Sequence, residues 1–144
     1  MKITPKMKKQ IHEIAVEMAG DKWSVRGYEK RIFDFVQDAS PMAHSNKEPW
    51  LQALRSGEYR KQKGQLADLW DHAQRCCLGV AYGVCGLDFA KYATSQYQEL
   101  RHPTDPGLPE GFMGLDRNTQ DALAELNDNC FTHAQIADLI EEFL

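Results

Sequence analysis

A continuous apolar run from Cys76 to Gly86 lies between two charged halves of the chain and holds three of the four cysteines. Buried glycines let neighbouring backbones approach closely, and a buried cysteine behaves as a small apolar side chain. The β-branched and aromatic residues of the run predict a buried strand over residues 76–85, which continues into a helix at about residues 87–92, and a helix over the run itself is the alternative. Its glycines lack the spacing of a dinucleotide-binding fingerprint, so we interpret them as packing residues and the run as a core element.

Length and composition bound the fold class. A chain of 144 residues, 42% hydrophobic and 26% charged, is expected to form one globular domain with a real core. No run approaches the roughly 18 apolar residues that span a bilayer, and residues 1–6 lead into no apolar signal region. The adjacent Cys76 and Cys77 fit poorly into a disulfide framework, so we expect reduced thiols, a cytoplasmic location and no contact with a membrane.

The net charge of −4 conceals two oppositely charged halves. Residues 1–63 hold 13 Lys and Arg against 8 Asp and Glu, a balance of +5, while residues 64–144 hold 4 against 13, a balance of −9. Three interpretations are open: a nucleic-acid face on the first half, a partner-binding acidic face on the second, or two halves that attract each other in the fold.

Two amphipathic helices are predicted before residue 40. Apolar residues recur at i, i+3, i+4 and i+7 over residues 8–19, and a second helical pattern covers residues 28–39. Gly20 and Asp21 end the first helix, so the two helices are expected to pair as a hairpin. The apolar positions of the first helix are Ile11, Ile14, Ala15 and Met18.

Proline residues mark a boundary after this hairpin. Pro41 and Pro49 interrupt any regular element, so residues 41–49 are predicted to be a linker. We therefore expect an appended N-terminal helical hairpin over residues 1–40 and a core domain over residues 50–144.

The core domain is predicted to be mainly helical. Residues near 58–66 and 76–85 are predicted to form a small sheet, and residues 101–111 a surface loop. The expected fold class is α+β: a mainly helical single domain with a small antiparallel sheet and an N-terminal helical hairpin. The predicted helices cover residues 50–55, residues 66–74, residues 120–126 with Asn118 or Thr119 as the cap, and residues 133–144 with Thr132 as the cap.

A basic and aromatic cluster follows the linker. Cations beside an aromatic ring are a combination that binds phosphate-bearing ligands, so we interpret the cluster as a candidate nucleotide pocket. A solvated hairpin edge protected by lysines and a protein contact are the two alternative interpretations. The candidate ligand-binding residues are Arg55, Tyr59, Arg60, Lys61 and Arg75.

Carboxylates dominate the last two predicted helices. Such a surface is compatible with contact to a basic partner protein, or with a simple solvated face. The last helix holds no Lys or Arg, which argues against sequence-specific DNA binding by a helix-turn-helix. An exposed patch that includes Trp23, Tyr28 or Phe131 would indicate a protein-binding surface. The candidate protein-contact residues are Asp138, Glu141, Glu142, Trp23 and Tyr28.

Neither a metal centre nor a catalytic centre is predicted. A pair of Cys77 with His72, His102 or His133 could supply a nucleophile, but the sequence gives no sign that any of these histidines lies next to it. We therefore expect no metal, no cofactor and no enzymatic activity. The residues that lack the spacing of recurring zinc sites are His72, Cys76 and Cys77, taken with His102 or Cys130.

Several short blocks, taken in order, carry a family resemblance. They are Leu-Arg-Ser-Gly-Glu-Tyr at 54–59, Cys-Cys-Leu-Gly-Val at 76–80, Leu-Ala-Glu-Leu-Asn-Asp at 123–128 and Ile-Ala-Asp-Leu-Ile-Glu at 136–141. With these blocks, residues 50–144 resemble a family of small proteins of tailed bacteriophages and prophages. Similar proteins usually begin near residue 50, and their second block runs on into a Cys-Asp pair where this chain has residues 82–86.

The resemblance implies a setting in the cytoplasm of a bacterial host. Small accessory proteins of phages commonly act by binding, so it implies a non-enzymatic protein that binds and inhibits or modulates a bacterial host protein, such as an anti-defence factor. The alternative is a small-ligand module that binds or sequesters a nucleotide through the basic pocket. The sequence leaves open whether the chain forms a homo-oligomer.

Overall fold

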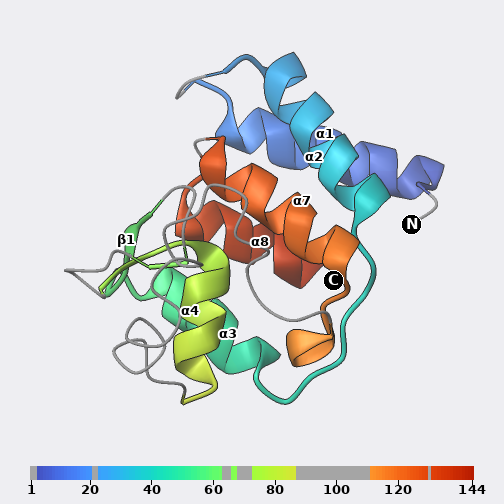
Figure 1. Cartoon of the computed structure of the whole chain (residues 1–144). Coiled ribbons are helices and arrows are strands. Elements are labelled where there is room, and N and C mark those ends of the chain that lie inside the picture. Colours follow the sequence, from blue (N-terminus) through green and yellow to red (C-terminus); the bar gives the residue numbers. More distant parts are fainter. Residues whose placement is uncertain (1–2, 21–22, 63–65, 68–72, 87–110, 130) are drawn as a thin grey trace.

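The described part of the chain forms three layers of paired helices (Figure 1). A computed structural model describes residues 3–20, 23–62, 66–67, 73–86, 111–129 and 131–144. The layers are α1 (Pro5–Met18) with α2 (Val25–Asp38), α7 (Arg117–Asp128) with α8 (His133–Phe143), and α3 (Lys47–Arg55) with α4 (Cys77–Val84). The remaining described elements are β1 (Arg60–Lys61), β2 (Gln74–Arg75) and the 3-10 turn η1 (Phe112–Gly114).

The predicted N-terminal hairpin is confirmed. Thr4 caps α1, because its hydroxyl accepts from the Met7 N–H at 3.2 Å, and Ser24 caps α2 by accepting from the Gly27 N–H at 3.3 Å. Each cap satisfies a backbone donor that the first turn of a helix leaves without an intrahelical partner. Beyond the hairpin itself, α2 packs against α7, and the buried residues of both hairpin helices belong to the hydrophobic core.

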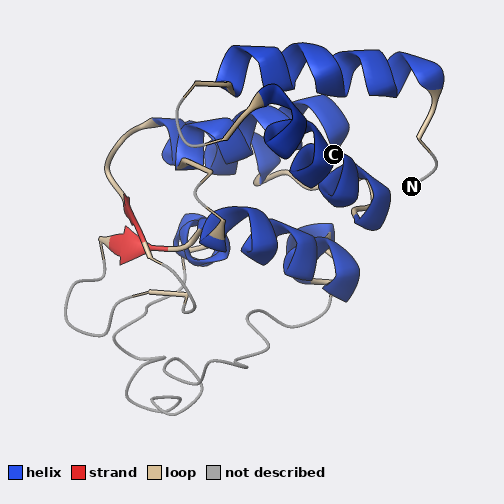
Figure 2. Ribbon diagram, turned by 90° about the horizontal axis from the view of Figure 1, so that it is seen from above, coloured by secondary structure: helices blue, strands red, loops and turns tan. Residues whose placement is uncertain are grey.

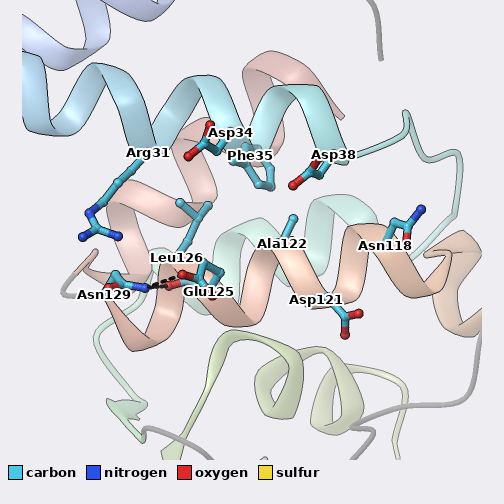
Figure 3. Close-up of a pocket in the computed structure, with 10 residues that line it drawn as sticks. All are labelled: Arg31, Asp34, Phe35, Asp38, Asn118, Asp121, Ala122, Glu125, Leu126 and Asn129. Carbon is cyan, nitrogen blue, oxygen red and sulfur yellow. Dashed lines mark hydrogen bonds between the residues drawn. The ribbon is translucent and has the colours of Figure 1, made fainter.

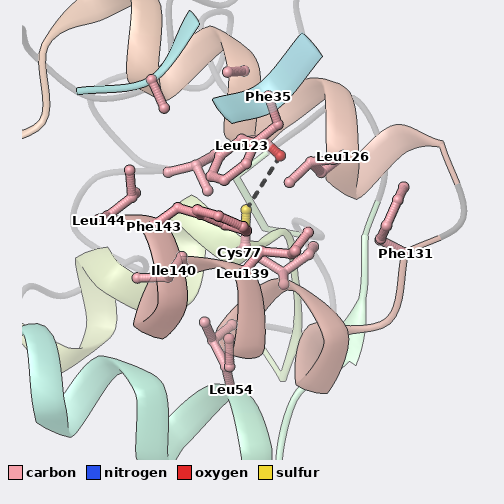
Figure 4. Packing of buried hydrophobic residues seen from close by; sticks show 14 of the residues in the cluster. Phe35, Leu54, Cys77, Leu123, Leu126, Phe131, Leu139, Ile140, Phe143 and Leu144 are labelled. Carbon is pink, nitrogen blue, oxygen red and sulfur yellow. Dashed lines mark hydrogen bonds between the residues drawn. The ribbon is translucent and has the colours of Figure 1, made fainter. Parts of the chain in front are cut away.

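The N-terminal hairpin packs directly onto the remaining helices. The Tyr28 ring meets the Phe131 ring edge-on at a centroid distance of 5.6 Å. The Ser40 N–H donates to Thr119 Oγ1 at 2.9 Å, and the Met42 N–H donates to the C-terminal Leu144 carbonyl at 2.9 Å. One continuous apolar core therefore includes side chains from both sides of the predicted boundary (Figure 4).

The third helix begins earlier than expected. The sequence predicts its start at Trp50, after Pro49, but α3 begins at Lys47. Pro49 is tolerated there because it occupies the first turn, where backbone N–H groups have no intrahelical acceptor. The last three residues of the predicted linker, 47–49, are therefore helical.

The prediction of a strand over residues 76–85 is wrong, because this run forms helix α4. The Cys76 thiol caps the helix by accepting from the Gly79 N–H at 3.4 Å. A Cβ at position 79 would overlap the Leu66 carbonyl oxygen, and one at position 83 would overlap the Arg75 guanidinium. Gly79 and Gly83 lie one helical turn apart, so they allow α4 to approach its neighbours and are packing glycines.

The sheet is parallel, so the predicted antiparallel sheet is wrong. Arg60 pairs with Gln74 and Lys61 with Arg75, at one end of the helix layers (Figure 2). The only antiparallel pairing in the described residues is an isolated bridge between Ala67 and Arg75. Because the apolar run satisfies its backbone groups within a helix, β1 pairs with the two residues that precede the run.

The bridge also contradicts part of the helix predicted over residues 66–74. Ala67 takes part in the bridge and Gln74 lies in β2, so neither end of that segment is helical. Residues 68–72, the predicted helix over residues 87–92 and residues 101–110 of the predicted loop lie outside the described residues.

The last two predicted helices are confirmed, with one change of cap. Thr132 caps α8, and its hydroxyl and the Gln135 side chain form a capping box. Asp116 caps α7 instead of the predicted Asn118 or Thr119, because its carboxylate accepts from the Thr119 N–H at 2.8 Å. This hydrogen bonding to Thr119 lowers the pKa of Asp116 below its ordinary value.

Two buried polar side chains fix the start of α4. Asn127 of α7 accepts from the Cys77 N–H at 3.2 Å and donates to the Gln62 carbonyl at 2.7 Å. The Trp50 indole N–H donates to the Cys77 carbonyl at 2.9 Å. The Cys77 N–H lies in the first turn of α4 and has no intrahelical acceptor, so Asn127 satisfies it. Together these bonds connect α3, α4 and α7.

Candidate functional site

Arg55 of the candidate nucleotide pocket is bound to the acidic helix α8. Its Nη2 lies 2.7 Å from Asp138 Oδ1 and 2.7 Å from Glu141 Oε2. The side chains are 33%, 60% and 58% exposed, so water screens both pairs. The structure therefore joins one residue predicted for ligand binding to two residues predicted for protein contact.

Three other residues of the predicted pocket come together near the start of α8. The Arg75 guanidinium lies over the Tyr59 ring at 4.8 Å from its centroid, and Lys61 Nζ donates to the Phe131 carbonyl at 2.8 Å. Partial burial lowers the pKa of Arg75 from its ordinary value. The remaining predicted residue, Arg60, is exposed on β1.

His133, which the sequence offered only as a possible partner of Cys77, is buried in this cluster, a place the sequence did not predict. Burial lowers the pKa of His133 from its ordinary value, and the nearby Lys61 charge lowers it further. No sequence signal separated this histidine from an ordinary first-turn residue, because its burial depends on β1 and β2 meeting α8.

The predicted acidic contact residues line a groove between α1 and α8. The groove has a volume of about 430 Å³. Asp138 and Glu141 accept from Arg55, and Glu142 Oε1 accepts from Gln10 Nε2 at 2.6 Å. All three predicted carboxylates thus have partners within the molecule.

The predicted aromatic contact residues do not form an exposed patch. Tyr28 is 2% exposed and Phe131 is fully buried, so this part of the interpretation is wrong. The Trp23 ring is partly buried, with its centroid 5.1 Å from Tyr28 and 5.7 Å from Phe131. These rings join α2 to the start of α8 because each lies on the core-facing side of its segment.

A second acidic groove lies between α2 and α7 (Figure 3), and we call it the α2/α7 groove. Its volume is about 510 Å³. Buried apolar side chains form its floor, carboxylates occur on both of its walls, and Arg31 lies at one end. The lining residues are Arg31, Asp34, Phe35, Asp38, Asn118, Asp121, Ala122, Glu125, Leu126 and Asn129.

The carboxylates of this groove have few internal partners. Asp34 is 3.5 Å from Lys30 in an exposed i, i+4 pair, and Glu125 accepts from the Asn129 side chain at 3.2 Å. Arg31 is directed to the Trp23 ring, 4.4 Å from its centroid. The groove thus carries net negative charge over an apolar floor.

A sequence signal for the α2/α7 groove was present and was not used. Asp34 and Asp38 are four residues apart on α2, and Asp121 and Glu125 are four residues apart on α7. Residues at i and i+4 lie on one helix face, so each helix carries an acidic stripe. Only the packing of α2 on α7 shows that the two stripes line the same groove.

The described cysteines do not form a nucleophilic site. Cys77 is fully buried, and its thiol donates to the Leu123 carbonyl at 3.6 Å (Figure 4). Burial raises the pKa of Cys77 well above its ordinary value, which disfavours the reactive thiolate. Within the described residues no cluster of His, Cys, Asp and Glu could hold a metal ion. His72, His102 and Cys130 lie outside those residues.

These observations define a mainly helical α+β protein with two acidic grooves. The family described as "Domain of unknown function (DUF8296)" matches residues 42–105, which is less than half of the chain and begins after α2. No curated protein and no solved structure matches this chain. Among the described helices, none is both long enough and apolar enough to cross a membrane.

Proposed function

We propose that this chain is a non-enzymatic, phage-type accessory protein that binds a basic segment of a bacterial host protein in the α2/α7 groove. The observation that carries the proposal is the combination of an apolar floor with carboxylates on both walls. Inhibition or modulation of the host protein, as in an anti-defence factor, would follow from occupation of that segment. The setting in the bacterial cytoplasm rests on the resemblance to phage and prophage proteins.

Lysine and arginine side chains match the chemistry of this groove. Each has an apolar stem that can cover Phe35, Ala122 and Leu126, and a cationic head that can reach the carboxylates on the walls. Opposite charge on the two partners would also accelerate their association. A volume of about 510 Å³ accommodates more than one side chain, so we propose a peptide segment as the occupant.

The α1/α8 groove is a weaker candidate for the same role. Its carboxylates Asp138 and Glu141 already bind Arg55, so a basic partner would have to displace an internal cation. In the α2/α7 groove, Asp38 and Asp121 have no ion pair in the described part of the chain, and a partner would meet them directly.

A nucleotide module remains the alternative proposal. The contact between Arg75 and Tyr59, with Lys61 nearby, favours it. The engagement of Arg55 by α8 argues against it, because a phosphate would have to compete with two carboxylates. Protein purified gently from cells and then heated would release an absorbing compound if this alternative were correct.

The proposal is tested by a pull-down from bacterial lysate with the tagged chain and two double variants. Asp38→Lys with Glu125→Lys reverses the charge of one carboxylate on each wall of the groove. Glu13→Lys with Glu58→Lys makes the same change of net charge at exposed positions outside it. We expect one stoichiometric host protein with the wild type and the control, and its loss with the groove variant. Equal capture by all three proteins would contradict the proposal.

A further inference from the structure

The N-terminal hairpin carries a depression with a positively charged rim, opposite in sign to the α2/α7 groove. It lies between α1 and α2, has a volume of about 390 Å³, and is open to solvent. We call it the hairpin depression. Its lining residues are Lys8, Ile11, Arg26, Glu29, Lys30 and Phe33.

The hairpin depression and the α2/α7 groove use different faces of α2. Positions 26, 29, 30 and 33 follow one stripe of the helix, and positions 31, 34, 35 and 38 follow another. At 100° of rotation per residue these stripes are well separated around the helix axis. The two surfaces could therefore be occupied at the same time.

The rim of the depression is cationic. Lys8 and Arg26 are exposed and form no ion pair with any described residue. The one acidic residue, Glu29, is engaged by His12, whose Nδ1 lies 2.7 Å from its carboxylate. Among the residues that the structure describes, Lys30 pairs only with Asp34, in an exposed contact of 3.5 Å. An anion that approaches the depression would therefore meet Lys8 and Arg26, cationic side chains that are not paired with carboxylates of the described hairpin residues.

The floor of the depression is apolar. Ile11 is 2% exposed, and Phe33 is partly buried and packs against the core. A ligand that made only ionic contacts would leave the exposed part of the Phe33 ring in contact with water, so Phe33 favours an occupant with an apolar side chain.

From this combination we propose that the hairpin depression docks an acidic segment of a partner protein that carries one large apolar side chain. The apolar side chain would pack on the exposed part of Phe33, while flanking carboxylates meet Lys8 and Arg26. A nucleic acid is disfavoured, because its phosphates would leave the floor uncovered and the whole chain has a net charge of −4. Helix α2 would then contact a basic segment in the α2/α7 groove and an acidic segment in the hairpin depression.

The test uses a short fluorescein-labelled peptide of alternating Glu and Ser residues with one central Phe, followed by fluorescence anisotropy. We expect saturable binding by the wild type that weakens as salt is added. Lys8→Glu with Arg26→Glu should weaken binding by about tenfold or more, since it replaces attraction by repulsion at both contacts. Lys9→Glu with Lys47→Glu makes the same change of net charge away from the depression and should bind like the wild type.

Two further measurements separate the contribution of the apolar floor to peptide binding from any contribution of the α2/α7 groove. A peptide with Ser in place of Phe should bind more weakly if the apolar floor takes part. The groove variant Asp38→Lys with Glu125→Lys should bind the acidic peptide at least as well as the wild type, so failure of the proposed function would not affect this result. Circular dichroism checks that each variant is folded.

Several outcomes would overturn the proposal. Absence of saturable binding, or equal binding by the Lys8/Arg26 variant, would remove the depression as a docking site. Equal binding of the Phe and Ser peptides would reduce it to a non-specific cationic patch. Self-association of the wild type that the same variant abolishes would assign the surface to a second copy. Binding to anionic phosphatidylglycerol vesicles without peptide binding would assign it to a lipid surface.

Discussion

Arg55 and Asp138 form an ion pair across the molecule, with Nη2 and Oδ1 2.7 Å apart. Arg55 belongs to the basic first half of the sequence and Asp138 to the acidic second half. Glu141 accepts from the same nitrogen at 2.7 Å, so one guanidinium meets two carboxylates of α8. Part of the charge asymmetry of the sequence is therefore satisfied within the fold.

This contact predicts a modest, salt-sensitive contribution to stability. Replacement of Arg55 by Ala should lower the free energy of unfolding by about 1 kcal/mol, because exposed pairs contribute little individually. A double-mutant cycle with Glu141→Gln, measured by urea denaturation, should show coupling that shrinks as salt is added. Zero coupling at low salt would show that the pair makes no energetic contribution.

The two helical glycines of α4 should differ in their tolerance of a methyl group. Gly79→Ala should destabilise the protein by about 3 kcal/mol, because its Cβ would overlap the backbone carbonyl of Leu66. Gly83→Ala should stay within about 1 kcal/mol of the wild type, because the Arg75 guanidinium can move and Ala favours a helix. Thermal unfolding of both variants checks this order, and the reverse order would contradict the packing of α4.

Burial of His133 predicts a loss of stability in acid. Its folded-state pKa lies below the ordinary value of 6.5, so the unfolded chain binds a proton more readily. This contribution is fully present above pH 6.5 and decreases as the pH falls through that value toward the folded-state pKa. His133→Gln should flatten the dependence of the unfolding free energy on pH between about pH 5 and 7. Identical pH profiles for wild type and His133→Gln would contradict the burial.

Cys77 should be unreactive in the folded protein. Its thiol is fully buried, whereas that of Cys85 is only partly buried. Brief alkylation with iodoacetamide followed by peptide mass spectrometry should label Cys85 before Cys77, with Cys77 labelled only as fast as the protein unfolds. Labelling of Cys77 ahead of Cys85 would revive the interpretation of Cys77 as a nucleophile.

Helix positions were predictable where local signals agreed. Apolar periodicity and the Thr132 cap placed α8 almost to the residue. The run over residues 76–85 was misassigned because a short buried strand and a short buried helix have the same apolar character. The signal that favours a helix was the spacing of Gly79 and Gly83, which lie one helical turn apart.

The candidate sites were less predictable, because they depend on which helices meet. Arg55 and Asp138 were assigned to different surfaces, yet α3 and α8 bring them into contact. Tyr28 was assigned to an exposed patch, but it lies on the face of α2 that packs against Phe131. Asp38 and Glu125 share a groove although no local pattern connects them.

The central proposal is that the α2/α7 groove binds a basic segment. The most direct test is an NMR titration of the ¹⁵N-labelled protein with a short peptide of alternating Lys and Ala residues. We predict saturable shifts of the amides of Asp34, Asp38, Asp121 and Glu125, which disappear in the Asp38→Lys, Glu125→Lys variant. Shifts confined to the α1/α8 groove, or no saturable shifts at low salt, would contradict the proposal.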